Sequence, residues 1–169
     1  MPKVISVNIN STDSINKAIR EVDKYRRQIE KKTKLLCERL AAMGAISVSL
    51  GFSQAFYDGP TDFAVSIESE SNNIFRVTAS GDTVAFVEFG AGITYAADGA
   101  HPKNGEFGTG PGTYPEGKGH WNDPKGWWLP KEKGGGKSWG NPAQMPIYRT
   151  AQELAREVAR VAAEVFSRD

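Results

Sequence analysis

Val87-Glu88-Phe89-Gly90-Ala91-Gly92 and Asn141-Pro142-Ala143-Gln144-Met145-Pro146 decide how this chain folds, because they bound its one long segment without periodicity. The first stretch ends a predicted strand, and the second leads into a predicted helix. The segment between them contains all four tryptophans and both histidines. Loops longer than about 12–15 residues are uncommon in compact domains unless they are functional or disordered. We therefore expect residues 91–145 to form a long flexible arm within a single domain, 1–169.

The tryptophans of this arm carry apolar surface that an isolated loop cannot bury. Each side chain presents about 150–250 Å², so together they could bury roughly 600–1,000 Å², about one partner's share of a standard interface. We expect the arm to pack against a neighbouring subunit, with an intramolecular flap over the core as the alternative. The turn-rich part from Gly105 to Gly119 is expected to be mobile. The four residues are Trp121, Trp127, Trp128 and Trp139.

Upstream of the arm, apolar residues at seven-residue spacing predict one amphipathic helix of about thirty residues. Ser11-Thr12-Asp13-Ser14 offers N-caps and a first-turn carboxylate, and Gly44 is a suitable residue to end the helix. A short strand over Lys3 to Ile9 is expected before it. The apolar positions are Ile15, Val22, Ile29, Leu36 and Met43.

The period then changes from helical to two, which predicts β-strands. Short turn sequences separate the alternating segments, and such short links favour an antiparallel meander of four strands. The last strand is apolar on both faces. The four segments are residues 46–52, 63–67, 74–79 and 83–89.

A second amphipathic helix is predicted after the arm. Pro146 precedes apolar residues at three- and four-residue steps from Ile147 to Val165, and proline is favoured in the first turn of a helix. We expect this helix to pack on the sheet. The predicted fold is α+β, with a long N-terminal helix, a four-stranded antiparallel meander, a long Gly/Trp-rich loop and a C-terminal helix.

Composition is that of an ordinary globular protein. The 169 residues carry a formal net charge of +1, which argues against a surface that binds nucleic acid or anionic lipid all over but allows a local basic face. Cys37 is the only cysteine, so no intrachain disulfide can form. We find neither a signal peptide nor an apolar run approaching the ~18 residues of a membrane span, and expect no membrane partner.

Two glycine motifs suggest nucleotide binding, but their context does not support it. Gly134-Gly135-Gly136-Lys137-Ser138 resembles the end of a phosphate-binding loop, yet Lys131 stands where a glycine is required and no helix can follow directly. Gly90-Ala91-Gly92 lacks the third glycine of a dinucleotide fingerprint, because Tyr95 stands there. No cofactor is therefore expected.

Candidate catalytic and metal-binding residues are equally isolated. The spacing of His101 and His120 with Asp98 and Asp123 is not that of a metal site. We interpret Cys37 as a structural or half-exposed thiol rather than a nucleophile. Glu88 has no second acid placed with it, so we expect it to cap backbone amides of the loop or to pair with a cation across an interface.

A basic stretch, Lys24 to Lys34, lies within the first predicted helix. A solvated face is its default interpretation. Contact with phosphates or with an acidic partner subunit is the alternative, so non-specific contact with DNA stays open.

The order of these elements and two motifs resemble a known family. A meander ending Val87-Glu88-Phe89-Gly90-Ala91-Gly92, a tryptophan-containing loop, and Gly140-Asn141-Pro142-Ala143-Gln144-Met145-Pro146 running into Ala151 are similar to the tail-completion, or head–tail joining, proteins of long-tailed bacteriophages. The resemblance begins near Ser11. The long insertion and the doubled Trp127-Trp128 depart from the family pattern.

The resemblance implies a non-enzymatic virion protein, assembled in the host cytoplasm, that forms a ring expected to be hexameric. It implies contacts with connector or head-closure proteins and with tail-tube or tail-terminator proteins. Glu88-Phe89-Gly90, with Pro142 and Pro146, would position the arm at its two roots. Trp127 and Trp128 would anchor a neighbouring subunit.

Two other classes of function stay open at this point. Exposed tryptophans would also suit a carbohydrate- or cell-wall-binding module. A hydrolase would have Glu88 or His120 as its candidate residue.

Overall fold

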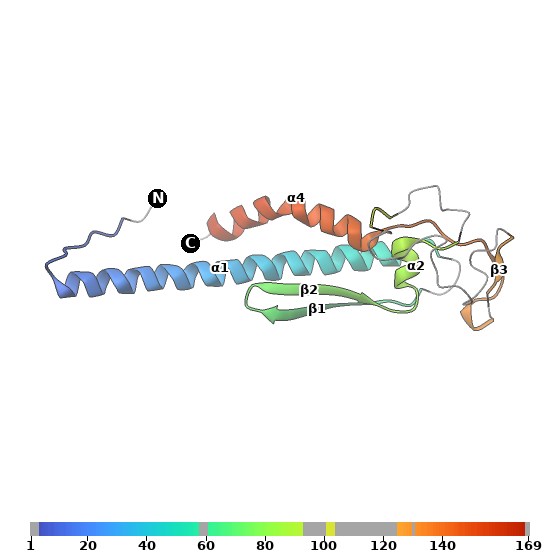
Figure 1. The fold of residues 1–169 in the computed structure, drawn as a ribbon, viewed down its shortest axis with the longest axis horizontal. Coiled ribbons are helices and arrows are strands. Elements are labelled where there is room, and N and C mark those ends of the chain that lie inside the picture. Colours follow the sequence, from blue (N-terminus) through green and yellow to red (C-terminus); the bar gives the residue numbers. More distant parts are fainter. Residues whose placement is uncertain (1–3, 58–60, 93–100, 104–124, 130, 168–169) are drawn as a thin grey trace.

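The computed structural model describes residues 4–57, 61–92, 101–103, 125–129 and 131–167. Figure 1 shows an elongated molecule in which α1 is the spine, α4 lies along one side of it, and the β1–β2 hairpin lies along another. The predicted α+β class is confirmed. The elements are α1 (Thr12–Ser53), β1 (Ala64–Ser71), β2 (Ile74–Ser80), α2 (Val84–Phe89), β3 (Trp127–Trp128), a 3-10 turn (Lys131–Lys133), β4 (Lys137–Ser138) and α4 (Pro146–Ser167).

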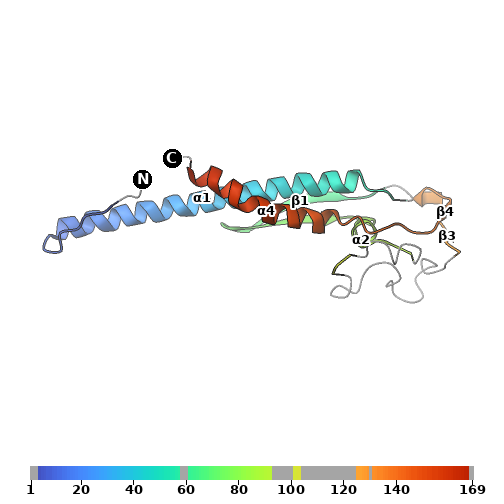
Figure 2. The ribbon, with the colours of Figure 1, turned by 90° about the horizontal axis from the view of Figure 1, so that it is seen from above.

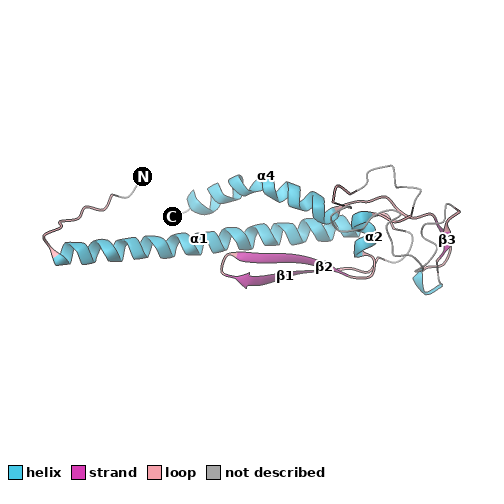
Figure 3. Ribbon diagram, in the orientation of Figure 1, coloured by secondary structure: helices cyan, strands magenta, loops and turns pink. Residues whose placement is uncertain are grey.

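The predicted four-stranded meander is wrong. The described residues contain two separate two-stranded sheets, β1 with β2 and β3 with β4. Figure 3 shows the first hairpin beside α1 and the second at the far end of the molecule. Two of the four predicted strand segments are helical instead.

The start of α1 agrees with the prediction. Ser11 has an extended backbone, and its Oγ accepts a hydrogen bond from the Ser14 N–H at 3.3 Å, so it caps the first turn. Asp13 supplies the expected first-turn carboxylate. The strand predicted over Lys3 to Ile9 is wrong for the residues described, which are irregular from residue 4 onward. No strand among the described residues pairs with this segment, and a lone strand cannot satisfy its backbone groups.

The end of α1 differs from the prediction, because the helix continues through the segment predicted as the first strand. Ala41, Gly44, Val48 and Phe52 are buried, and their three- and four-residue steps place them on one helical face. The alternating apolar pattern of residues 46–52 suited a strand equally well, since short apolar runs are ambiguous.

Two glycines bring α4 close to α1. A Cβ added at Gly51 would lie 2.7 Å from Cβ of Pro146, and one added at Gly44 would lie 3.0 Å from Cδ1 of Leu154. Gly44 therefore does not end the helix. Its lack of a side chain instead makes room for the neighbouring helix.

The predicted C-terminal helix is confirmed as α4, but it packs mainly along α1 rather than on a sheet. Near its end, Lys32 Nζ lies 3.2 Å from the carbonyl oxygen of Phe166, and Arg39 and Glu164 form an ion pair of 3.9 Å. The first part of α1 extends beyond the end of α4, and no other described helix or strand lies beside it (Figures 1 and 2).

The β1–β2 hairpin confirms the two middle strands of the prediction. Its antiparallel register runs from Ala64 opposite Ser80 to Ser71 opposite Ile74, and the turn falls at Asn72-Asn73 as expected. The segment after it, predicted as a strand over residues 83–89, is α2 instead. Thr83 fixes this change, because its Oγ1 donates to the carbonyl oxygen of Asp62 at 2.8 Å and accepts from the Asp62 N–H at 3.1 Å.

The hydrophobic core is small and lies where α1, the β1–β2 hairpin and α2 meet. Val48, Phe52 and Val87 are its buried members, and the rings of Phe52 and Phe63 stack with centroids 5.4 Å apart. Because α2 turns Val87 into this core, it also fixes the chain that enters the arm.

By length and composition, α1 could cross a membrane, contrary to the expectation from uninterrupted apolar runs. A helix in a protein core meets the same test, and the C-terminal half of α1 packs on α4 and on the β1–β2 hairpin. Only 22% of its most apolar window is buried, however. Large apolar side chains of α1 such as Ile46 and Leu50 are exposed and available to a partner.

We expect Gly51→Ala to destabilise the chain more than Gly44→Ala. The new methyl group meets the rigid ring of Pro146 in the first case and the end of the flexible Leu154 side chain in the second. Overpacking costs about 1–3 kcal/mol, and both variants gain about 1 kcal/mol of helix propensity. Chemical denaturation followed by circular dichroism should give Gly51→Ala an unfolding free energy about 1–2 kcal/mol below that of Gly44→Ala. Equal stabilities would contradict the close contact between α1 and α4.

Candidate functional site

The two sequence motifs that bound the arm lie side by side in the structure. Ala91 N–H donates to the carbonyl oxygen of Asn141 at 2.9 Å, and Asn141 N–H donates back to Ala91 at 3.0 Å. We call the two stretches, Val87–Gly92 and Gly140–Pro146, the clamp. The clamp joins the two ends of the arm at its base.

Amide side chains attach the clamp to the rest of the fold. The buried Asn141 donates from Nδ2 to the carbonyl oxygen of Phe86 at 2.8 Å. The Gln144 side chain pairs with the backbone of Phe56 in both directions, at 2.8 Å and 2.5 Å. The Gln144 N–H also donates to the carbonyl oxygen of Val87 at 3.0 Å. The clamp is thereby held to α2 and to the chain that follows α1.

Glycine is required where the two stretches of the clamp are closest. Gly140 has φ of 95°, a conformation that residues with a side chain rarely adopt. A Cβ at this position would overlap the carbonyl group of Ala91. Gly140 therefore allows the backbone contact between Ala91 and Asn141.

A buried carboxylate lies at the centre of the clamp. Glu88 is 3% exposed, and its oxygens accept hydrogen bonds from the first amides of α4: Ile147 N–H at 2.8 Å and Tyr148 N–H at 2.9 Å. These amides have no partner within the helix, and the helix dipole favours a negative group at this end. Glu88 thus caps backbone amides as expected, but those of α4 instead of the loop.

His101 completes the surroundings of Glu88. Its Nδ1 accepts a hydrogen bond from the Lys103 N–H at 3.0 Å, and its Nε2 lies 3.2 Å from Glu88 Oε1. Because Nδ1 is an acceptor, the proton is on Nε2, which donates to Glu88. The ring lies between Phe89 and Tyr148, with centroid distances of 4.5 Å and 5.1 Å.

The geometry indicates that Glu88 and His101 have a structural role. Both are buried, and their polar atoms are engaged with each other and with backbone amides. Among the described residues, no three His, Cys, Asp or Glu residues are grouped to hold a metal ion. The other candidates for a metal site, Asp98, His120 and Asp123, lie outside the described residues.

The glycine run that resembled a phosphate-binding loop is the turn of a second hairpin. In this hairpin Trp127 pairs with Ser138 and Trp128 with Lys137. Gly134, Gly135 and Gly136 all have positive φ and reverse the chain. The motif therefore leads into β4 instead of a helix.

The tryptophans of this hairpin have different surroundings. Trp127 is half-buried, and an added Cβ at Gly92 would lie 3.2 Å from its ring. Trp128 is 75% exposed and Trp139 is 47% exposed, with Lys137 Nζ 5.1 Å from the Trp139 ring centroid. Trp127 thus covers the clamp of its own chain, as an intramolecular flap would. Trp128 is available to a partner, and Trp121 lies outside the described residues.

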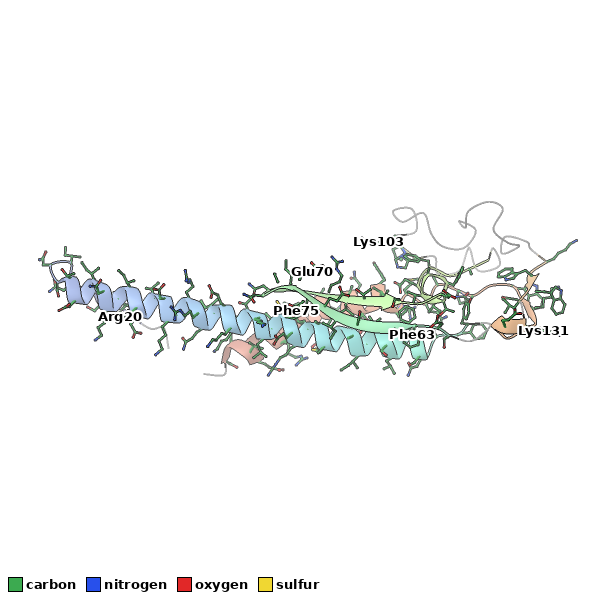
Figure 4. All side chains as sticks on the ribbon, turned by 90° about the horizontal axis from the view of Figure 1, so that it is seen from below. Arg20, Phe63, Glu70, Phe75, Lys103 and Lys131 are labelled. Carbon is green, nitrogen blue, oxygen red and sulfur yellow. The ribbon has the colours of Figure 1, made fainter. Side chains whose placement is uncertain are left out.

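A second uncovered surface runs along the first part of α1. Figure 4 shows this part, around Arg20, with side chains projecting away from the helix and no other described helix or strand over them. Of the irregular N-terminal residues, 4–6 lie beside Lys17 and Ala18 at its start. Five large side chains on one side of this part of α1 are exposed, three of them from the predicted seven-residue repeat, and we call the five the apolar stripe. They are Ile15, Ile19, Val22, Tyr25 and Ile29.

The structure brings together five of the predicted site residues: Glu88, Phe89, Gly90, Pro142 and Pro146. Glu88, Gly90 and Pro146 are buried inside the chain, which suits the predicted role of positioning the ends of the arm.

Sequence reasoning missed His101, Asn141 and Gln144 as parts of the clamp. Asn141 and Gln144 belong to the quoted motif, so their place in it was a signal that could have been used. His101 offers no such signal, because the side chains of Glu88 and Tyr148 that surround it come from other segments of the chain.

Comparisons with protein families, curated proteins and solved structures gave no match to this chain.

We expect Glu88→Gln to destabilise the fold. The amide NH₂ cannot accept from a backbone N–H, so one amide of α4 is left without its partner in a buried site. Such a loss costs about 1–3 kcal/mol. Glu68, an exposed carboxylate on β1, provides the control Glu68→Gln, which should stay within about 0.5 kcal/mol of the unmodified chain. Denaturant unfolding measures both, and matching stabilities would show that the cap contributes nothing.

Proposed function

We propose that this chain is a non-enzymatic structural protein of the bacteriophage head–tail junction. It forms a ring that joins the capsid connector to the tail, and it acts in the virion after assembly in the host cytoplasm. Its partners are further copies of itself, connector or head-closure proteins, and tail-tube or tail-terminator proteins.

The clamp is the observation that carries this proposal. The two motifs behind the family resemblance are far apart in sequence, yet they form one hydrogen-bonded unit at the base of the arm. A unit that fixes both ends of a loop presents that loop to a partner. Glu88, the candidate hydrolase residue in this unit, is buried and bonded, so this geometry favours presentation over catalysis.

Uncovered apolar surface supports the assembly role. The apolar stripe and Trp128 lie at opposite ends of the molecule (Figures 1 and 4). Head-to-tail contacts between identical subunits use two different surfaces on each copy, and they form a ring where the rotation between successive copies closes. The segment that was expected to be a strand with two apolar faces is α2. Exposed apolar surface for contacts between subunits lies instead on the apolar stripe and on the β3–β4 hairpin.

A carbohydrate-binding module is the second candidate, because Trp128 and Trp139 are both exposed on one small hairpin. Aromatic faces of this kind stack on sugar rings. Retention of the chain on peptidoglycan or soluble glycans, lost in Trp128→Ala, would favour this function over the neck role.

We expect Trp128→Ala to impair joining of heads to tails without unfolding the chain. Exposed tryptophans that anchor an interface contribute at least about 2 kcal/mol of binding, roughly 30-fold in affinity. Electron microscopy of particles assembled with this variant should show unjoined heads and tails. Ile74→Ala, at the exposed turn of the β1–β2 hairpin, is the control and should give joined particles. Normal joining with Trp128→Ala would remove Trp128 from the interface.

We expect the purified chain to be a monomer or weak oligomer and to form larger rings with tail-tube protein. Val22→Gln with Ile29→Gln should abolish these rings, because polar groups then interrupt the apolar stripe. Ile67→Gln with Ile74→Gln changes two exposed positions of the β1–β2 hairpin and should leave the rings intact. Native mass spectrometry distinguishes these states. Rings that persist in the stripe variant would contradict a role of the stripe in assembly.

A further inference from the structure

A line of basic residues follows the side of α1 away from the apolar stripe, and we infer that this basic stripe binds the phosphate backbone of duplex DNA. Successive members are alternately three and four residues apart, which places them on one side of a helix. At 1.5 Å per residue the line is about 25 Å long. The basic stripe consists of Lys17, Arg20, Lys24, Arg27, Lys31 and Lys34.

The cations of the basic stripe are available for a ligand. All six are exposed. In the described part of the chain, five of them have neither an ion pair nor a hydrogen bond, and Lys34 pairs with Glu38 at 3.7 Å. Four of them line one surface groove together with Asp23 and Gln28, and Asp23 is the one carboxylate in that groove. The four are Arg20, Lys24, Arg27 and Lys31.

Positive charge is concentrated in this segment. Residues 17–34 contain eight basic and three acidic residues, whereas the whole chain has a net charge of +1. Beyond the end of α4, no other described helix or strand lies beside this part of α1 (Figures 1 and 2). Cations clustered on one exposed side create a local positive potential that a near-neutral protein otherwise lacks.

The chemistry of the basic stripe fits a phosphate backbone. Its line contains no aromatic side chain that could stack on a base, which points to sequence-independent contact with phosphates. A membrane-surface helix would bury the apolar stripe in lipid, and the basic stripe would then point away from the headgroups. In the DNA arrangement the apolar stripe stays available for a neighbouring copy.

This inference rests on the proposed function and deepens it, because it names DNA as a further partner of the proposed junction protein. It can be tested apart from that function, since the isolated full chain suffices for the binding measurement.

The test is fluorescence anisotropy of a short mixed-sequence DNA duplex titrated with the full chain between about 50 and 200 mM salt. Six phosphate contacts predict a slope of log affinity against log salt of about −5, and the triple variant Arg20→Gln, Lys24→Gln, Arg27→Gln should lower its magnitude to about 3. Its affinity at low salt should fall at least about tenfold. The control Lys131→Gln, Arg149→Gln, Arg156→Gln removes the same charge elsewhere and should bind DNA as the unmodified chain does.

Several outcomes would overturn the inference. They are an absence of DNA binding at low salt, an equal loss of affinity in both triple variants, tighter binding to polyglutamate than to DNA, and binding to phosphatidylserine vesicles but not to DNA. Ring formation with tail-tube protein is measured separately on the triple variant of Arg20, Lys24 and Arg27. If this variant still forms rings, a failure of DNA binding contradicts the inference about DNA but not the proposed function.

Discussion

The contact between the Glu88 carboxylate and the first amides of α4 is the constraint on which the far end of the molecule depends. A buried charge is costly unless hydrogen bonds compensate it, and the N-terminus of a helix supplies free N–H groups and a favourable dipole. Through Glu88, α2 is tied to α4, and through His101 a residue of the arm joins both. One side chain therefore couples the core to the base of the arm.

This coupling divides the molecule into parts with different roles. The C-terminal half of α1, the β1–β2 hairpin, α2 and α4 pack on one another, so substitutions there act first on folding. The beginning of α1 and the exposed part of the β3–β4 hairpin have few contacts within the described chain. Substitutions in these parts can change binding while the fold persists, which makes them the places to test function.

Local signals in the sequence predicted the features that depend on neighbouring residues. The Ser11 cap, the Asn72-Asn73 turn and the start of α4 at Pro146 all depend on interactions within a few residues. Residues 46–52 and 83–89 were assigned wrongly because their short apolar patterns suit a strand or a helix equally. Distant contacts decided between them: Gly51 against Pro146 in one case and Thr83 with Asp62 in the other.

The candidate site shows what the two sequence motifs that bound the arm can and cannot say about function. Most of the motif residues, such as Glu88, Gly90 and Asn141, face the interior of the chain and are held there by folding. A partner cannot contact buried side chains, so the motif preserves the base of the arm and leaves the choice of partner to other residues. Partner specificity then depends on the exposed surfaces, Trp128 and the two stripes of α1. In the proposed ring, the apolar stripe would contact neighbouring protein while the basic stripe on the other side of the same helix contacts DNA.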